Sequence, residues 1–242
     1  EGGERPGFEE HALVDEPVRP KLETLNAIIE HRAAFLTDYQ DAAYAERYRA
    51  KVEKVRAAEA AAVPGSDALG KAVARYLFKL MAIKDEYEVA RLYAGDAFKR
   101  QLETEFESWD SLDLYLAPPF IASRDPRTGE AKKRRYGPWM LKLMPHLARL
   151  KQLRGSKWDP FGRTGERRME RQLLIDYEAL LDEIAERLTP ANHATATELA
   201  GLPEHIRGFG HVKGRHVKEV KAREVQLRGE LRVSALDATA AE

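Results

Sequence analysis

A glycine-punctuated loop near the C-terminus has the residue types and spacing best suited to binding chemistry. It alternates glycines with cationic or titratable side chains: Arg207, Gly208, Gly210, His211 and Lys213. Backbone N–H groups at glycine turns before a helix can bind an anion, and neighbouring cations strengthen that binding. The spacing is Gly-x-Gly-x-x-x-Gly with no convincing strand before it, so the loop is not a dinucleotide fingerprint. The pattern predicts a phosphate or carboxylate site; the alternative is a tight connection in which His211 donates to a backbone carbonyl.

A run of four cations forms the second candidate site: Lys132, Lys133, Arg134 and Arg135. Four aromatic residues follow it, namely Tyr136, Trp139, Trp158 and Phe161. Cations and aromatics together can bind nucleic acid through phosphate contacts and stacking. The whole chain argues against that partner, because its 40 Lys and Arg residues are balanced by 40 Asp and Glu residues.

The charges are unevenly distributed along this neutral chain. Residues 131–171 contain 13 basic and 3 acidic residues, whereas residues 85–113 contain 3 basic and 9 acidic residues. Two such blocks can neutralise each other inside the fold, or the basic block can face an acidic or phosphate-bearing partner. We favour internal or inter-domain neutralisation and keep the partner-binding alternative open.

Other reaction chemistries lack the residues that they require. The chain has no cysteine, which excludes disulfides, thiolate nucleophiles, iron–sulfur ligation and cysteine-based zinc sites. His211 and His216 are five residues apart, on poorly matched sides of a helix, and no carboxylate set accompanies them. No Gly-x-Ser-x-Gly motif supports a hydrolase triad. We therefore predict no catalytic residue, no metal ligand and no cofactor held by this chain.

The sequence predicts no membrane segment. Charged residues make up 33% of the chain, and no apolar run approaches the roughly 18 residues that a spanning helix needs. The first residues also lack the basic and then apolar pattern of a signal peptide. Together with the absence of cysteine, these features favour a cytoplasmic location without a membrane partner.

The stretch from Leu69 to Tyr93 has the strongest helical periodicity and should be the element on which the other helices pack. Its apolar residues recur at intervals of three or four, so they share one side of a helix: Leu69, Val73, Leu77, Leu80, Ile83, Tyr87, Ala90 and Tyr93. Its other side carries Lys79, Lys84, Asp85 and Glu86. We expect those four side chains either to face solvent or to line an inter-domain contact.

The same patterns assign the rest of the chain. Residues 21–62 should form two helices with an N-cap at Thr37 or Asp38, and further helices are predicted at 139–153, 165–188 and 191–200. Residues after 215 fit a helix, although alternating apolar residues leave a strand possible. The fold class is mainly α, a multi-helix bundle-like domain with one β hairpin at about 112–136. We expect a linker or extended arm at 1–20, the helical domain at 21–233 and a flexible tail at 234–242.

Seven short blocks, in matching order, carry a family resemblance over about residues 35–220. They are Tyr76-Leu-Phe-Lys-Leu-Met-Ala, Lys84-Asp-Glu-Tyr-Glu-Val-Ala-Arg-Leu-Tyr, Leu116-Ala-Pro-Pro, Gly137-Pro-Trp-Met, Asp159-Pro-Phe-Gly, Glu166-Arg-Arg-Met-Glu-Arg and Ile206-Arg-Gly-Phe-Gly-His-Val-Lys. In these blocks the chain resembles the C-terminal region of the fused indolepyruvate ferredoxin oxidoreductases, members of the 2-oxoacid:ferredoxin oxidoreductase family.

The resemblance implies a parent enzyme that oxidatively decarboxylates arylpyruvates to aryl-acetyl-CoA. Such an enzyme uses thiamine diphosphate, Mg²⁺, Fe–S clusters and CoA, passes its electrons to ferredoxin, and is expected to be a homo-oligomer. The family's thiamine motif is Gly-Asp-Gly with a downstream Asn, but here Gly95-Asp96 is followed by Ala97. The cluster ligands of the family are cysteines, and this chain has none. No catalytic residue of the family therefore carries over to this chain.

Two hypotheses of different classes follow. In the first, the chain is a non-catalytic accessory domain that contacts other domains of the parent enzyme, with the loop at 207–213 touching CoA phosphates or a neighbouring domain. In the second, it is a separable anion- or partner-binding module, such as a docking site for acidic ferredoxin on Lys132 to Arg135.

Overall fold

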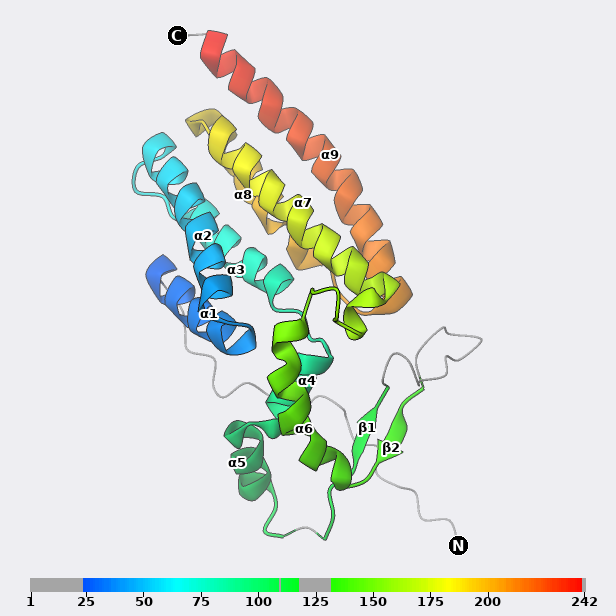
Figure 1. The fold of residues 1–242 in the computed structure, drawn as a ribbon. Helices are drawn as coiled ribbons and strands as arrows, with labels where there is room; N and C mark the ends of the chain where they lie inside the picture. The colour runs from blue at the N-terminus through cyan, green and yellow to red at the C-terminus, as the bar shows by residue number, and fades with distance from the viewer. Residues whose placement is uncertain (1–23, 109, 118–131, 241–242) are drawn as a thin grey trace, which may run out of the picture.

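Helices with one buried face build the larger part of the molecule, as the computed structural model shows (Figure 1). The structure describes residues 24–108, 110–117 and 132–240, so the linker expected at 1–20 lies outside the described residues. The larger part, here called the bundle, consists of α1 (Leu25–Tyr39), α2 (Ala42–Ala62), α3 (Ala68–Met81), α7 (Gly165–Arg187), α8 (His193–Gly201) and α9 (Gly210–Ala240). The short 3₁₀ turns η3 (Pro190–Asn192) and η4 (Leu202–His205) flank α8.

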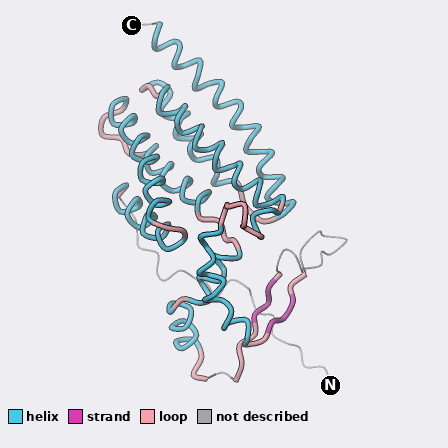
Figure 2. The backbone as a smooth tube through the Cα atoms, in the orientation of Figure 1, coloured by secondary structure: helices cyan, strands magenta, loops and turns pink. Residues whose placement is uncertain are grey.

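A small lobe lies beside one end of the bundle (Figures 1 and 2). It consists of α4 (Glu86–Ala94), α5 (Asp96–Glu105), β1 (Leu114–Leu116), β2 (Arg134–Tyr136) and α6 (Trp139–Arg149). Its own core is a cluster of buried Ala90, Leu114 and Met144, separate from the core of the bundle. The chain returns to the bundle through two 3₁₀ turns, η1 (Leu150–Leu153) and η2 (Phe161–Arg163).

The mainly α fold with one hairpin is confirmed. β1 and β2 pair antiparallel, with Leu114 opposite Tyr136 and Leu116 opposite Arg134. Leu114 is buried against the small lobe, while its neighbour Tyr115 is exposed, as the alternation of a strand requires. Residues 118–131, which connect the two strands and contain an Asp-Pro-x-x-Gly sequence, lie outside the described residues.

The continuous helix expected from Leu69 to Tyr93 is wrong, because the chain breaks between α3 and α4. The N–H of Ala82 closes the last turn of α3 by donating to the Phe78 carbonyl. Asp85 then caps α4, its Oδ1 accepting from the Glu88 N–H at 2.8 Å. Because an Asp side chain satisfies a free amide at a helix start, it favours a new helix at this position. The break directs α3 into the bundle and α4 into the small lobe.

Other boundaries differ by a few residues. The first two helices separate at Asp41, which caps α2 by accepting from the Tyr44 N–H at 2.8 Å, and not at Thr37 or Asp38. The residues after 215 are helical, which settles the open choice between helix and strand. Helix α9 continues to Ala240, so most of the segment set aside as a tail belongs to it.

A buried carboxylate, Glu59, joins three helices of the bundle. It accepts hydrogen bonds from the backbone N–H groups of Leu69 (2.9 Å) and Gly70 (2.8 Å) and from Ser66 Oγ (2.8 Å), and it contacts His193 Nε2 at 2.8 Å. Asp67, the N-cap residue of α3, makes no capping bond through its side chain. Glu59, which lies on α2, caps α3 instead. Burial opposes ionisation of Glu59, but the bonds from His193 and the amides outweigh it and lower its pKa.

We predict that Glu59→Gln lowers the free energy of unfolding by about 1–3 kcal/mol at neutral pH. The amide keeps only one acceptor oxygen, so either the Leu69 or the Gly70 N–H loses its partner, and the remaining bonds lose the charge of the carboxylate. A lowered native pKa supplies stability above the unfolded value of 4.5, and that stability is lost as the pH falls through the native value. The difference between wild type and variant in urea unfolding should therefore shrink as the pH falls below 4.5. Glu53→Gln, on the exposed side of the same helix, is the control. A difference that is constant with pH would contradict the ionised role of Glu59.

Candidate functional site

The bundle and the small lobe meet at Arg154, which directly follows η1. Its Nε and Nη2 donate to the two carboxylate oxygens of Asp85, at 2.5 and 2.9 Å. Its Nη1 donates to the Tyr39 carbonyl and to Gln40 Oε1, both at 2.7 Å. The Arg154 and Asp85 side chains are largely buried. We call these four residues the clamp, because they tie the end of α1, the start of α4 and the segment after α6 to one guanidinium.

The protonation states of Arg154 and Tyr39 are fixed by their surroundings. The Arg154 guanidinium lies 3.7 Å from the centre of the Tyr39 ring and 5.6 Å from that of Tyr87. Burial disfavours its charge, but the hydrogen bonds to Asp85 outweigh burial and raise the pKa of Arg154. Burial also raises the pKa of Tyr39 well above its ordinary value. Since both groups stay protonated at physiological pH, the clamp is suited to holding structure and not to proton transfer.

Asp159 organises the segment that follows Arg154. Its Oδ1 accepts from the Tyr87 hydroxyl (3.1 Å) and from the Phe161 and Gly162 N–H groups (3.1 and 3.0 Å), while Oδ2 accepts from the Gly155 N–H at 2.8 Å. A Cβ at position 162 would lie 2.4 Å from Asp159 Oδ2, so this close approach requires glycine. The Asp-Pro-Phe-Gly block of the sequence is therefore a structural turn.

A cavity of about 510 Å³ opens between the clamp, the start of α2 and one face of α7. Most of its charged groups are already paired: Arg47 with Glu178, Arg154 with Asp85, and Arg167 with Glu170. Glu86 lines it as well. Glu86 Oε2 is shielded from solvent and has no hydrogen-bond partner among the described residues, although Arg167 Nη2 lies 3.6 Å away. Burial raises the pKa of Glu86, and Arg167 opposes that rise.

The predicted anion loop is occupied by carboxylates of the same chain. The Gly210 N–H donates to Glu166 Oε1 at 3.1 Å, and Lys213 Nζ forms an ion pair with the buried Glu170. Gly208 and Gly210 have φ values of +80° and +56°, so they use the conformational freedom of glycine. Glu166 and Glu170 lie one turn apart on α7 and fasten it to the start of α9.

The remaining residues of that loop face outward. Arg207 is exposed and contacts Glu204 at 3.8 Å. The alternative expectation was that His211 donates to a backbone carbonyl. In the structure the histidine beside a backbone carbonyl of this loop is His216, whose Nδ1 lies 2.9 Å from the Arg207 carbonyl oxygen. His211 is exposed.

The four-cation run lies at the hairpin. Lys132, Lys133, Arg134 and Arg135 are all exposed, and the last two belong to β2. Arg135 donates to Asp113 Oδ2 at 2.6 Å. This contact, the clamp and the approach of Arg167 to Glu86 each join the basic block of the sequence to the acidic one, so part of the charge imbalance is neutralised within the fold.

Of the four polar residues singled out in the Leu69–Tyr93 stretch, three are engaged inside the fold, namely Lys79, Asp85 and Glu86. Lys79 Nζ donates to the carbonyls of Pro203 (2.8 Å) and Glu204 (3.1 Å) and so joins α3 to η4. Asp85 belongs to the clamp and Glu86 lines the cavity. Lys84 alone of the four is exposed.

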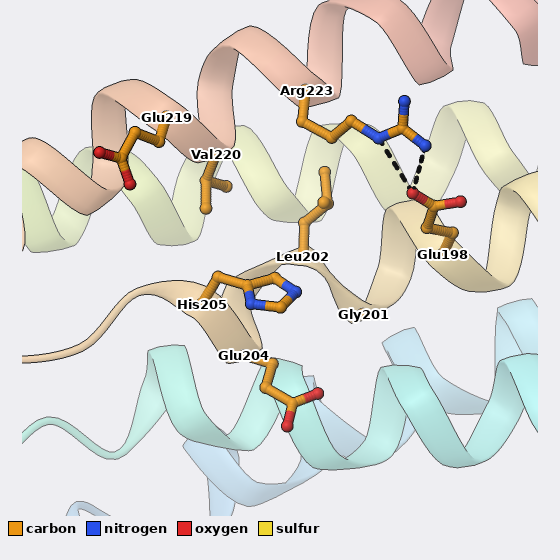
Figure 3. Close-up of a pocket in the computed structure, with 8 residues that line it drawn as sticks. All are labelled: Glu198, Gly201, Leu202, Glu204, His205, Glu219, Val220 and Arg223. Carbon is orange, nitrogen blue, oxygen red and sulfur yellow. Dashed lines mark hydrogen bonds and ion pairs between the residues drawn. The ribbon is translucent and has the colours of Figure 1, made fainter.

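A second, more open cavity of about 520 Å³ lies among α8, η4 and α9 (Figure 3). Arg223 of α9 reaches across to Glu198 of α8, with Nη2 and Oε1 2.6 Å apart. Glu204 points toward α3, where the Tyr76 hydroxyl donates to it at 2.7 Å. These polar groups join helices of the bundle, and none of the residues singled out from the sequence lines this cavity.

Within the three described ranges, no group of three or more His, Asp or Glu side chains is arranged to hold a metal ion. No helix in those ranges is both long and apolar enough to cross a bilayer.

Residues 25–226 match the model of a family of unknown function, DUF6537. The chain belongs to this family. Neither the comparison with curated proteins nor that with solved structures gave a match. The matched DUF6537 region includes the clamp, Asp159 and the loop at 207–213.

Sequence reasoning missed Arg154 and Asp159 as organising residues of the DUF6537 domain. Asp159 had a detectable signal, since an Asp-Pro-Phe-Gly turn offers a carboxylate to the amides that follow it. Arg154 had none beyond its place in a basic block, because all its partners are distant in sequence.

We predict that Arg154→Ala lowers the free energy of unfolding by about 3–5 kcal/mol, since it leaves Asp85 buried without its partner. Asp85→Asn keeps an oxygen that can cap α4 but removes the charge. The double variant should be less destabilised than the sum of the single variants, and chemical denaturation of all four proteins measures this coupling. Arg168→Ala, at an exposed position on α7, is the control. Additive effects would show that the pair does not act as a unit.

Proposed function

We propose that this DUF6537 domain is a structural, inter-domain module of a larger enzyme that resembles the indolepyruvate ferredoxin oxidoreductases, and that it performs no chemistry itself. One observation carries the proposal: the groups of the loop best suited to bind an anion already bind carboxylates of the same chain. The Gly210 N–H donates to Glu166, and the Lys213 ammonium pairs with Glu170. The order of the seven sequence blocks supports the choice of parent.

A phosphate could bind this loop only by displacing those carboxylates. Glu170 and Lys213 are both largely buried, and Glu170 also pairs with Arg167. Separating Lys213 from Glu170 would leave a buried charge with fewer partners, which costs free energy that the incoming anion would have to supply. The loop is therefore better suited to fastening α9 to α7 than to binding CoA.

The ionisable groups at the lobe junction support the same role. Arg154 is held in its charged form by Asp85, and Tyr39 is held neutral by burial. In this proposal the thiamine diphosphate, Mg²⁺, Fe–S clusters and CoA belong to other parts of the parent enzyme, and the present domain supplies a rigid surface against which those parts assemble in the cytoplasm.

In a full-length oxidoreductase that contains this domain, we predict that Lys213→Ala lowers the free energy of unfolding by about 1–3 kcal/mol. Arg207→Ala, at an exposed position of the same loop, should change it by less than about 0.5 kcal/mol. Neither variant should alter the affinity for CoA measured by titration calorimetry. A selective loss of CoA affinity in Arg207→Ala, at unchanged stability, would overturn the purely structural role.

A second candidate function is ferredoxin docking, favoured by the exposure of all four cations from Lys132 to Arg135 on the hairpin. In the full enzyme, the variant Lys132→Glu with Arg134→Glu should slow the reduction of ferredoxin at low salt. It should leave the reduction of a small artificial acceptor unchanged, because only a protein partner would dock on the four cations. The effect should weaken at physiological salt, where exposed charges are screened. Equal rates with both acceptors, in wild type and variant, would eliminate docking at this site.

A further inference from the structure

The exposed side of α6 carries large apolar side chains that no described element covers. Trp139, Leu143 and the following Leu150 are 54%, 48% and 48% exposed. Because successive helical residues are about 100° apart around the axis, positions 139, 143 and 150 fall within about 40° of one another and form one narrow stripe. The opposite side of α6, with buried Met144, packs on α4, and α6 lies in front of α4 in Figure 1. An apolar stripe of this kind on a charged domain marks a contact surface.

The border of this stripe is basic. No Asp or Glu occurs between Lys132 and Trp158, and Lys142 and Arg149 are exposed on α6 itself. A partner that covers the stripe must therefore combine an apolar group with carboxylates.

The same lobe displays a surface of that composition. At the end of α5 and just after it, Glu103, Glu105 and Glu107 are exposed, and Phe106 between them is 40% exposed. Within α5 itself, Phe98 and Leu102 are buried. We call residues 103–107 the acidic segment.

We propose that the α6 stripe of one molecule binds the acidic segment of a second copy of this chain. In a two-fold pair each molecule supplies both surfaces, so the contact forms twice and the assembly closes as a dimer. Phe106 packs against Leu143 and Trp139, while the glutamates meet Lys142 and Arg149. The inference rests on the exposed residues of the small lobe and does not depend on the proposed function.

Sedimentation equilibrium of the 242-residue chain tests the pairing. Wild type should dimerise at micromolar concentration, and Leu143→Glu should weaken the dimer at least about tenfold, because it places a carboxylate opposite the acidic segment. Val225→Glu replaces an apolar residue on α9 that is 73% exposed, against 48% for Leu143, and should leave the dimer intact. Circular dichroism checks that each variant is folded. A monomeric wild type at about 100 µM, or a Leu143→Glu variant that dimerises normally, would overturn the proposal.

A charge exchange tests the identity of the two surfaces. The variant Lys142→Glu with Arg149→Glu and the variant Glu103→Lys with Glu105→Lys should each be monomeric alone, because like charges face each other in both homodimers. Mixed in equal amounts, they should form a heterodimer in which both contacts are attractive. A mixture that stays monomeric would refute the acidic segment as the occupant, and variants that still form homodimers would refute the electrostatic pairing.

Discussion

The arrangement of the two lobes depends on one buried ion pair, between Arg154 and Asp85. A buried pair stabilises a fold only when its geometry is good and its remaining donors are satisfied. Both conditions hold here, because the pairing uses two nitrogens and two oxygens and the third nitrogen binds the end of α1. The guanidinium also lies over the Tyr39 ring, which offers a polarisable surface to a charge removed from water. The clamp is therefore a junction at which the end of α1, the start of α4 and the segment after α6 meet.

The rest of the molecule follows the same principle of carboxylates placed at helix ends. Glu59 caps α3 from a neighbouring helix, Asp159 gathers the amides of its own turn, and Glu166 meets the amide at the start of α9. Each of them satisfies backbone groups that a helix end or turn leaves without a partner. These carboxylates thus find their hydrogen-bond partners within the same chain, which supports the structural role proposed above.

Much of the fold could be predicted from local periodicity, but its connections could not. The helices expected at 165–188 and 191–200 were confirmed within a few residues, and the Thr189 side chain caps the turn that leads into the second. The break at 82–85 was missed because Leu80, Ile83 and Tyr87 keep helical spacing across it, so the apolar pattern continues where the backbone does not. The loop glycines were recognised as turn formers, yet the groups that bind there come from α7, more than forty residues upstream. Such long-range partners leave no mark in a local pattern.

Hydrogen exchange on the Arg154→Met variant tests the role of the clamp most directly. Methionine retains much of the apolar volume of arginine but cannot bind Asp85. If the clamp holds the small lobe in place, amides in the first turn of α4 and in residues 155–162 should exchange at least about tenfold faster than in wild type, while those in the centres of α3 and α7 keep their protection. Equal loss of protection in both lobes, or unchanged exchange at α4, would contradict the account.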